Sequence, residues 1–328
     1  MMGKTVMIKI TGGTGFIGSH IVEYFQKQGI DINLVTRDIA DLRDADALKI
    51  AFKDADCVIH NAAKACDWGD YDDFYANNVT GTINVIEACI SNNIKQIIIT
   101  SSCSVYGEES YWGIKDENSP LNSHYPYFLH RIFPSAMNYY RDTKKMAKEA
   151  ALEYANQIDI CFIEPVWVYG EREFHTGFYE YLKTAKAKIP LICGSKHNKF
   201  HAIYAGDLAK AYYLAYTKKA TGSYIIAPPK AEKMDLIYTI FCEAAGFKKP
   251  RNLPKFICYP IGFAMELLWT IFRAKNPPLL TRGRVNMFYD NIEYSAQKAR
   301  DILGFECEYS FKQGIEKTVK WYKREGLL

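Results

Sequence analysis

Tyr140 and Lys144 are the pair of side chains in this 328-residue sequence whose types and spacing best suit chemistry. On a helix, residues four positions apart lie on one face, so this phenol and this ammonium can meet over a single ligand. A nearby ammonium favours the phenolate and brings the pKa of the phenol, ordinarily about 10, toward neutral pH. Such a phenol can give a proton to a carbonyl, or take one from an alcohol, while a hydride moves. The pair therefore predicts acid–base chemistry on a carbonyl or hydroxyl group.

Spacing alone does not identify this pair, because it also occurs at Tyr111/Lys115 and at Tyr179/Lys183. Tyr111/Lys115 lies in a loop-like stretch rich in Trp, Gly, Asn and Pro. Tyr179/Lys183 follows the fifth expected strand. The pair described above falls in an expected helix between the fourth and fifth strands. Its side chains can therefore reach the carboxyl ends of the strands, where ligands bind in open parallel sheets.

A glycine-rich turn at residues 11–18 follows the first expected strand and opens the first expected helix. Its sequence is Thr11-Gly12-Gly13-Thr14-Gly15-Phe16-Ile17-Gly18. Glycines let the backbone turn tightly and approach a pyrophosphate, and the helix N-terminus offers free N–H groups to the phosphates. We expect a dinucleotide to bind here, and the residues expected to hold it are Gly12, Gly15, Phe16, Ile17 and Gly18.

The end of the second expected strand bears on which dinucleotide binds. Arg37 could pair with a 2′-phosphate, which favours NADP. Asp38 lies about 20 residues after Gly18, where an acidic residue binds the ribose hydroxyls of NAD. Both residues could instead be solvated turn residues. We expect a preference for NADP(H), with NAD as the alternative.

Short apolar strands alternate with helices through the first half of the chain. The strand-like runs are residues 6–10, 32–35, 57–60, 96–100 and 160–163, and the helical segments are 17–28, 45–53, 73–91 and 138–156. This alternation predicts an α/β fold with a doubly wound parallel Rossmann sheet. The second half is less regular, with helices expected at 207–217, 233–245, 257–272 and 311–324 and a strand at 223–226. We assign 1–165 and about 200–227 to a nucleotide-binding domain, and 166–199 and 228–328 to a smaller mixed α/β substrate-binding lobe.

Composition argues against several classes of protein. The 41 basic and 37 acidic residues leave a dispersed net charge of +4, so nucleic-acid binding is not expected. The nine cysteines contain no CxxC pair. We expect them to be reduced core residues in the cytoplasm, and we expect no metal site. The N-terminus does not read as a signal peptide. The apolar run at 256–272 is interrupted only by Glu266 and is shorter than the about 20 residues of a membrane span.

The ordered motifs of the chain resemble those of the extended short-chain dehydrogenases/reductases. They are residues 11–18, Ala40-Asp41-Leu42, His60-Asn61-Ala62-Ala63, Asn78-Val79-Thr80-Gly81-Thr82, residues 100–107, Tyr140 with Lys144, residues 165–170 and Gly206-Asp207-Leu208-Ala209. The resemblance implies a catalytic trio of Ser102, Tyr140 and Lys144, in which the serine donates to the reacting oxygen. It implies further cofactor contacts from Asp41, Leu42, Ala62, Ala63, Lys64, Thr100, Tyr140, Lys144, Pro165 and Val168, with Lys144 on the nicotinamide ribose. It also implies a homodimer built on the helices at 73–91 and 138–156.

Within this superfamily the chain is most similar to the 3β-hydroxysteroid dehydrogenase and dihydroflavonol reductase branch. The residues that carry this likeness are 35–38, 67–69, 73–75, 198–199, 202–204, 277–284 and 321–322. Two features depart from the family pattern. Glu164 precedes Pro165, where an arginine is usual, and the stretch from Ser102 to Tyr140 is long. The aromatic residues of that insert could form a wall over the substrate or simply pack the loop; they are Tyr111, Trp112, Tyr125, Tyr127, Phe128 and Phe133.

The apolar segment at 253–272 bears on the substrate. A helix of this kind at the mouth of the pocket suits a hydrophobic ketone or alcohol, such as a sterol-like 3β-hydroxy or 3-keto compound, taken from a membrane surface. An ordinary core helix is the alternative. We therefore expect an NADP(H)-dependent oxidoreductase with Tyr140 as general acid/base. A nucleotide-sugar epimerase, dehydratase or reductase is the second hypothesis, in which Lys199, Arg282 and Arg284 could bind a diphosphate; a non-catalytic dinucleotide sensor is the third.

Overall fold

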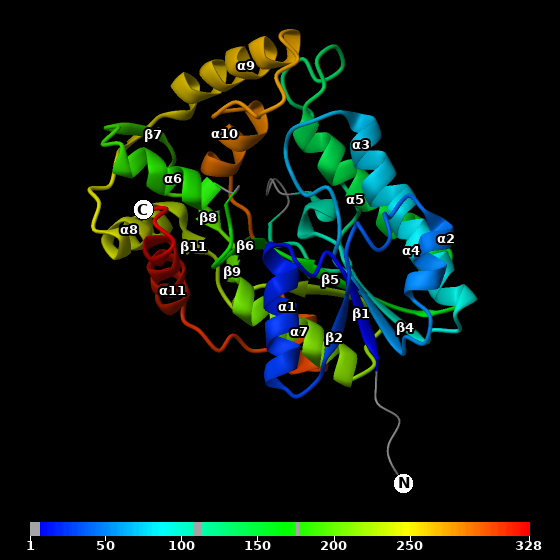
Figure 1. The fold of residues 1–328 in the computed structure, drawn as a ribbon. Coiled ribbons are helices and arrows are strands. Elements are labelled where there is room, and N and C mark those ends of the chain that lie inside the picture. The colour runs from blue at the N-terminus through cyan, green and yellow to red at the C-terminus, as the bar shows by residue number, and fades with distance from the viewer. Residues whose placement is uncertain (1–6, 108–112, 175–176) are drawn as a thin grey trace.

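The computed structural model describes residues 7–107, 113–174 and 177–328. A parallel sheet forms the centre of one part of the molecule, and most helices of the second half of the chain gather beside it (Figure 1). The first residue of the expected strand at 6–10 lies outside the described residues, as do Tyr111 and Trp112 of the aromatic insert.

Six strands form the central sheet. They are β1 (Ile8–Thr11), β2 (Ile32–Val35), β3 (Cys57–His60), β4 (Gln96–Thr100), β5 (Asp159–Pro165) and β10 (Gly222–Ile226). Every neighbouring pair is parallel, in the order β10-β5-β4-β3-β1-β2. The winding direction reverses between β1 and β3, and ligands bind at such a switch point in open parallel sheets. The predicted doubly wound α/β fold is confirmed.

Alternate side chains of these strands enter two separate apolar cores, as the two-residue period of a strand requires. Ile98 and Ile163 belong to one core, whereas Ile97 and Ile99 belong to the other. Both faces of the sheet are therefore covered, which explains why the strands read as nearly continuous apolar runs.

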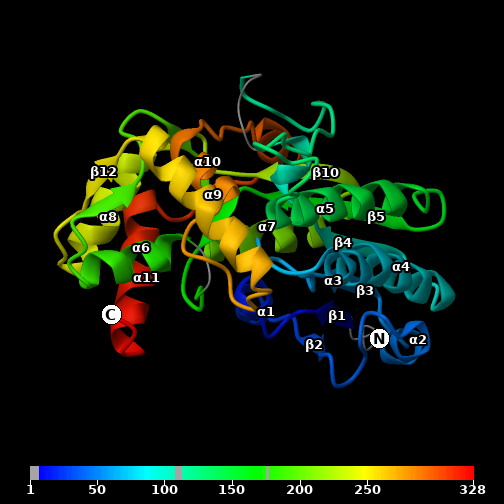
Figure 2. The ribbon, with the colours of Figure 1, turned by 90° about the horizontal axis from the view of Figure 1, so that it is seen from above.

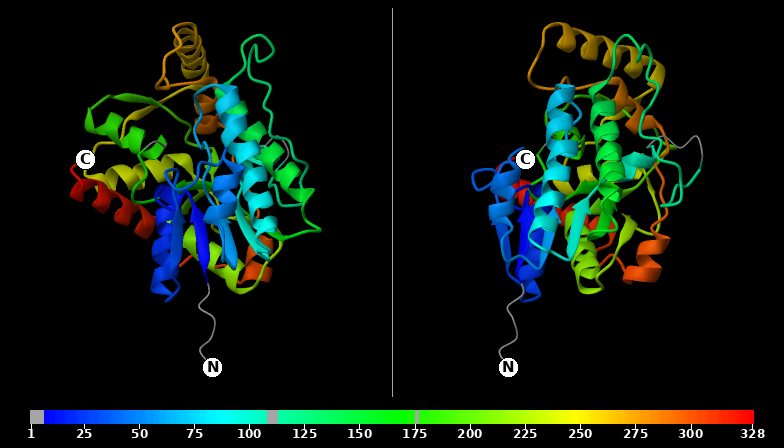
Figure 3. Two further views of the ribbon diagram at one scale, coloured as in Figure 1. Left: turned by 45° about the vertical axis from the view of Figure 1, so that its right-hand side comes forward. Right: turned by 90° about the vertical axis from the view of Figure 1, so that its right-hand side faces the viewer.

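Helices supply the two covers (Figures 1 and 3). On one face, α1 (Phe16–Lys27) packs against α7 (Ala205–Thr217). On the other face lie α2 (Ala45–Ala51), α4 (Gly81–Ser91) and α5 (Ala136–Leu152). Because α5 connects β4 to β5, its first turns stand near the carboxyl ends of these two strands. This is the position that the sequence predicted for Tyr140 and Lys144.

Two helices differ most from the prediction, whereas the others differ by at most two residues at either end. The segment expected as one helix at 73–91 consists of α3 (Tyr71–Tyr75), a π-helical turn η1 (Ala76–Thr80) and α4. A π turn contains one extra residue, which a hydrophobic period of 3.6 does not show. The helix α5 begins at Ala136 and ends at Leu152, earlier at both ends than the expected range 138–156.

The rest of the chain forms short strand pairs and further helices. The predicted helices of the second half are confirmed as α7, α8 (Met234–Ala245), α9 (Lys255–Ile271) and α11 (Phe311–Arg324). The sequence analysis did not predict the remaining elements, and the strands among them are two or three residues long, too short to define a period. These elements are η2 (Cys103–Tyr106), β6 (Trp167–Tyr169) paired with β9 (Ala202–Tyr204), β7 (Leu191–Cys193) with β12 (Arg251–Leu253), β8 (Lys199–Phe200) with β11 (Glu232–Lys233), α6 (Gly177–Lys186), α10 (Arg282–Tyr289) and η3 (Ala299–Leu303).

Candidate active site

A cavity of about 1000 Å³ opens at the switch point of the sheet, and elements of the second half of the chain complete its walls. Most residues predicted to bind a cofactor or act in catalysis line this one cavity. They are Gly12, Gly15, Phe16, Ile17, Arg37, Asp41, Leu42, Ala62, Ala63, Thr100, Ser102, Tyr140, Lys144, Pro165 and Val168. Gly18 and Lys64 are not among the lining residues.

The glycine turn has no room for side chains. Gly12 has a φ of +69°, and a Cβ there would lie 2.7 Å from the backbone nitrogen of Ala62. A Cβ on Gly18 would lie 2.0 Å from the carbonyl oxygen of Gly12, so Gly18 acts by letting α1 pack against the turn. The N-cap of α1 is Gly15, which offers no side chain to the first N–H groups of the helix. These groups are thus available to a phosphate, and the turn fits the pyrophosphate of a dinucleotide.

Arg37 lies at the end of β2 with its side chain 79% exposed, and its Nε is 3.9 Å from Asp41. Asp41 accepts two hydrogen bonds from the guanidinium of Arg43, from Nε and from Nη2, each at 2.8 Å. The Arg43 guanidinium beside Asp41 holds the pKa of this carboxyl well below its usual range. The charge of Asp41 is therefore compensated, and Arg37 adds a cation to the rim of the cavity. Asp38 is exposed and does not line the cavity.

Tyr140 and Lys144 project from the first half of α5 into the cavity wall. The ammonium of Lys144 donates a 2.8 Å hydrogen bond to the carbonyl oxygen of Thr100 at the end of β4. Burial disfavours the charged form and lowers the pKa of Lys144 to about 8, so the ammonium persists at neutral pH. Tyr140 is half-buried.

Ser102 follows β4 and is the N-cap of η2. Its hydroxyl oxygen accepts a hydrogen bond from the backbone N–H of Ser104 at 3.2 Å and another from the Ser104 hydroxyl at 2.9 Å. Because both of these bonds are accepted, the hydrogen of the Ser102 hydroxyl can be donated toward the cavity.

A buried polar network lies beneath these groups. The two ring nitrogens of His60 contact the hydroxyls of Thr11, at 2.8 Å, and Thr82, at 3.1 Å. Burial, together with the charge of Lys144, lowers the pKa of His60 to about 3, so the ring is neutral. Thr100 donates to Asn61 at 3.0 Å. The network holds the ends of β1, β3 and β4 together next to Lys144 and Ser102.

Asn78 links α5 to the segment that follows β3. It lies in the π turn η1, and its side-chain oxygen accepts from the backbone N–H of Lys64 at 2.8 Å. Its amide nitrogen donates to the hydroxyl of Thr143 on α5 at 3.0 Å. The Lys64 ammonium turns away to Asp73, at 3.0 Å. Lys64 thus contributes its backbone to this corner, and the π turn that aims Asn78 was not visible in the sequence.

Glu164, the unusual acid before Pro165, has a buried partner. Its carboxylate lies 2.8 Å from the ammonium of Lys148 and accepts a 2.6 Å hydrogen bond from the hydroxyl of Tyr106. Burial raises the pKa of Glu164, while the neighbouring ammonium opposes that rise. The ion pair joins β5 to α5, one turn beyond Lys144. The negative charge of Glu164, the residue that departs from the family pattern, is therefore balanced by Lys148 within the protein.

The three cations considered for a diphosphate are not available together. Arg282 is fully buried and bound to Glu266, with its Nε 2.8 Å from the carboxylate. Lys199 pairs with Glu293 at 3.2 Å and does not line the cavity. Arg284 does line the cavity, but its guanidinium makes a two-point ion pair with Asp67, with Nη2 2.8 Å from Oδ1.

The part of the cavity that the second half of the chain lines is largely apolar. Its lining includes Tyr181, Ile189, Leu191, Ile192, Cys193, Leu253, Cys258, Ile261, Leu279, Leu280, Met287 and Phe288. The cavity lining also includes Glu173, Glu180 and Arg284, and each of these charged residues has a partner within the protein. Besides the Arg284 ion pair, Glu180 binds Lys183 at 3.0 Å, and Glu173 accepts a 3.0 Å hydrogen bond from Tyr322. A substrate there meets hydrocarbon and compensated charges, which suits a hydrophobic molecule.

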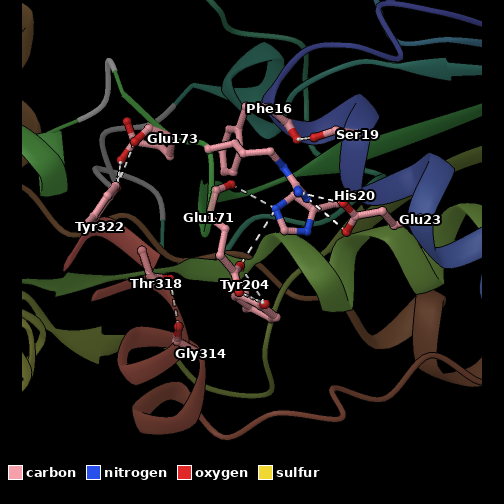
Figure 4. Close-up of polar contacts among 11 residues, drawn as sticks. Phe16, Ser19, His20, Glu23, Glu171, Glu173, Tyr204, Gly314, Thr318 and Tyr322 are labelled. Carbon is pink, nitrogen blue, oxygen red and sulfur yellow. Dashed lines mark hydrogen bonds and ion pairs between the residues drawn. The ribbon is translucent and has the colours of Figure 1, made fainter. Parts of the chain in front are cut away.

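The segment after β6 also reaches the cavity, although no role was predicted for it. Arg172, Glu173 and Phe174 line the wall. Figure 4 shows how neighbouring residues anchor this segment to α1, β9 and α11. Glu171 accepts from His20 through its backbone and from Tyr204 through its carboxylate, at 3.0 and 2.7 Å. This segment directly follows the motif at 165–170, and that position in the sequence is the signal from which its place at the cavity could have been predicted.

The aromatic insert packs against α9 and does not wall the substrate in its described part, 113–135. Tyr127 is buried, and Phe128 and Phe133 meet the ring of Phe263 edge-on at 5.4 and 6.1 Å. The described aromatic residues of the insert are absent from the lining of the cavity.

In the described ranges we find no group of three potential metal-ligating side chains, and no helix long and apolar enough to cross a bilayer.

Comparison with known proteins places this geometry in context. A sequence model described as "NAD dependent epimerase/dehydratase family" matches residues 8–227. The chain is 30% identical to the "Putative UDP-glucose 4-epimerase" of Methanocaldococcus jannaschii, over 98% of the chain and 99% of that protein. It is 26% identical to "3beta-hydroxysteroid-dehydrogenase/decarboxylase isoform 2" of Arabidopsis thaliana, over 97% of the chain and 64% of that protein.

Solved structures share the fold. The NAD complex of UDP-glucose 4-epimerase from Thermus thermophilus superposes with a TM-score of 0.74 at 20% identity, covering 97% of the chain and 99% of that structure. The likeness to short-chain dehydrogenases/reductases of the epimerase and 3β-hydroxysteroid dehydrogenase type, expected from the motifs, is thus confirmed.

Proposed function

Because the chain belongs to the NAD dependent epimerase/dehydratase family and is an NAD(P)-dependent enzyme, we propose that it is an NADP(H)-dependent oxidoreductase of hydrophobic ketones and alcohols. Sterol-like 3β-hydroxy or 3-keto compounds are the expected substrate class. One observation carries this proposal. The glycine turn, which fits a dinucleotide, and an apolar half whose charged groups are already paired line the same cavity. The Arabidopsis relative, named as a 3β-hydroxysteroid dehydrogenase, supports it.

The chain's own residues supply the proton chemistry in this proposal. A bound nicotinamide supplies or accepts the hydride. In reduction, the Tyr140 phenol gives its proton to the substrate oxygen, and in oxidation it takes that proton back. The Lys144 ammonium, one helical turn away, stabilises the phenolate that remains. The Ser102 hydroxyl donates to the same substrate oxygen, because its own oxygen is already engaged by Ser104.

An absorbance assay tests the reaction class. The protein is mixed with NADPH and a panel of 3-ketosteroids, and separately with a panel of UDP- and dTDP-sugars. The proposal predicts loss of reduced nicotinamide with the ketosteroids. Because epimerisation returns the hydride and leaves the absorbance unchanged, the sugar panel is also analysed by chromatography, and the proposal predicts that no sugar is converted. Conversion of a nucleotide sugar without turnover of any hydrophobic ketone would contradict it.

A nucleotide-sugar epimerase or dehydratase is the second candidate, and the relative from M. jannaschii favours it. A diphosphate needs a free cation in the substrate half. Arg284 lines that half, but it would have to leave Asp67 to bind phosphate. The Asp67→Asn variant therefore discriminates between the candidates. If the second candidate holds, releasing Arg284 strengthens nucleotide-sugar binding; if the first holds, no nucleotide sugar binds either protein.

We propose NADP(H) as the preferred cofactor because Arg37 brings an exposed cation to the rim next to the compensated Asp41. An ion pair with a 2′-phosphate is worth about 1.5–3 kcal/mol, or about ten- to a hundredfold in binding. The Arg37→Ala variant should raise KM for NADPH by about that factor and leave KM for NADH nearly unchanged. A wild-type preference for NADH would refute the role given to Arg37.

We also propose a cytoplasmic homodimer. Nine free cysteines, seven of them buried, suit a reducing compartment. The proposed dimer face is formed by α3, α4 and α5, where Tyr71, Tyr75, Met146 and Leu152 are exposed. Light scattering of the wild type and of the Tyr75→Glu/Met146→Glu variant tests it. A dimer that becomes a monomer in the variant supports this face, whereas a wild-type monomer rejects it.

A further inference from the structure

We propose that the outer face of α9, together with the tip of the insert at 126–134, docks on an anionic lipid surface. The hydrophobic substrate of the proposed function then enters the cavity from the lipid. The docking itself is independent of turnover, whereas the route of the substrate rests on the proposed function. Four observations carry the inference: the exposed face of α9, the anchoring of its inner face, the charges around it and its continuity with the cavity.

The outer face of α9 is apolar along the whole helix. At 100° per residue, its exposed apolar positions fall within one arc of about 160°. They are Phe256, Ile257, Pro260, Ile261, Ala264, Leu268 and Ile271, and Phe272 continues the arc at the C-cap. Phe256 and Phe272, at the two ends, are 77% and 76% exposed. Figure 2 shows α9 in front of the other elements, with no ribbon over it.

The inner face of α9 is fixed to the protein. Glu266 is buried and accepts from the backbone N–H and from the guanidinium of Arg282, at 2.9 and 2.8 Å. A Cβ on Gly262 would lie 3.0 Å from the side chain of Val285, so the helix sits close against α10. The helix therefore presents one face to a surface while the other stays on the protein, which is the geometry of an interfacial amphipathic helix.

The tip of the insert enlarges the same surface. Phe128, Leu129 and Ile132 are 57%, 45% and 83% exposed. The backbone N–H of Phe128 donates to the hydroxyl of Tyr259 on α9, and the ring of Phe128 meets that of Phe263. Two segments far apart in the sequence thus form one apolar surface, larger than the scattered exposure of single residues that a soluble protein shows.

Within the two segments that form this surface, the exposed charges have one sign, and the half-buried Lys255 at the start of α9 is paired with Asp290 at 2.8 Å. Residues 126–134 and 253–281, all of them described, contain one acid, Glu266, and it is buried. The exposed cations are Arg131 at the insert tip and Arg273 and Lys275 just after α9. Lysine and arginine beside an apolar face attract anionic lipid headgroups. This sign favours an anionic bilayer over a neutral hydrophobic partner.

The apolar surface continues into the cavity. Ile261 on α9 and Leu279 after it both line the cavity, and they are 45% and 54% exposed. A hydrophobic molecule in the lipid therefore reaches the apolar half of the cavity along hydrocarbon, without crossing water. This continuity is the reason that the surface serves the proposed substrate.

Vesicle flotation of the full chain tests the docking. Vesicles of phosphatidylcholine with phosphatidylglycerol are compared with vesicles of phosphatidylcholine alone. We expect the protein to float with the anionic vesicles and to float at least about tenfold less with the neutral ones. The Phe256→Ser/Ile271→Ser/Phe272→Ser variant should lose flotation. The Ile50→Ser variant, which changes a 77% exposed residue on α2, should keep it.

Three results would overturn the docking: no flotation of the wild type, equal flotation of the triple variant, or a dimer in solution that only the triple variant dissociates. The last result would assign the surface to a second copy of the chain. Turnover of a short, water-soluble ketone should be the same in the triple variant and the wild type, which shows that the variant is folded. Flotation without turnover of any ketone would support the docking and refute the proposed function, so the two failures are distinguishable.

Discussion

Lys144 keeps its charge inside the protein because the backbone supplies a partner. Its ammonium is buried and donates to the Thr100 carbonyl, while the neighbouring His60 is held neutral. The positive charge at this point therefore comes from Lys144 and not from the ring beneath it. A single positive charge four residues from Tyr140 is what the proposed proton transfer by the phenol requires.

The pH dependence of turnover should report Lys144. Its pKa is lowered to about 8 by burial, so its charge is present below that pH and is lost as pH rises through it. We expect kcat for ketone reduction to fall above about pH 8. In the Lys144→Arg variant the cation cannot titrate, so the variant should be slower but should lack this inflection. A variant that keeps the inflection near pH 8 would assign it to another group.

Local motifs were readable at the scale of residues, whereas distant partners were not. The glycine turn and the Tyr140/Lys144 spacing are contained in a few consecutive residues, and the structure brings them to one cavity. The Arg284–Asp67 pair joins residues 217 positions apart, and only the fold reveals that this cation is already bound. The same holds for Lys148 and Glu164, which compensate each other from different elements.

At the scale of elements, α9 is held by one buried ion pair and by aromatic packing. The Arg282 guanidinium is bound by Glu266 and also donates to the carbonyl of Phe133 at 2.9 Å. It lies over the rings of Phe133 and Phe263. One cation therefore ties α9, α10 and the insert together. Sequence periodicity predicted α9 as a helix, but it could not show that its acid faces inward.

Removing Glu266 from its ion pair with Arg282 should destabilise the protein. The Glu266→Ala variant leaves a buried guanidinium without its counter-charge, which costs about 3–5 kcal/mol. Urea unfolding should show a loss of unfolding free energy of this size. The matched control is Glu149→Ala on α5, where an exposed acid lies 3.7 Å from Lys145. The control should change stability by less than about 0.5 kcal/mol. Equal losses of unfolding free energy in the two variants would show that the Glu266–Arg282 ion pair does not hold α9.

At the scale of the whole molecule, the parallel sheet determines where the chemistry can occur. Its switch point collects the ends of β1, β2 and β4, and α5 adds Tyr140 and Lys144, the proposed acid–base pair, to the same cavity. The alternation of apolar strands and helices made this half predictable. The second half was less predictable, because its strands other than β10 are two or three residues long and depend on partners across the chain.

Acid should destabilise the fold through His60, whose pKa is about 3 in the folded state and ordinarily about 6.5. Between these values the unfolded chain binds more protons, so the free energy of unfolding falls as pH falls. One such group contributes up to about 1.4 kcal/mol per pH unit. Between pH 6 and 4, the free energy of unfolding of the wild type should change with pH more steeply than that of the His60→Gln variant, by up to this amount per pH unit. The hydrogen bonds lost in the variant lower its free energy of unfolding at every pH and do not change the slope. Identical slopes for the two proteins would exclude His60 as the source of the pH dependence.

Turnover by the Tyr140→Phe variant is the most direct test of the account. The wild type and the variant are compared for NADPH-dependent reduction of a hydrophobic ketone, and cofactor affinity is measured for both by titration. Loss of the phenolic proton should lower kcat by about 10²–10⁴-fold and leave the affinity for NADPH unchanged. A variant that reduces the ketone as fast as the wild type would contradict the assignment of Tyr140 as the acid.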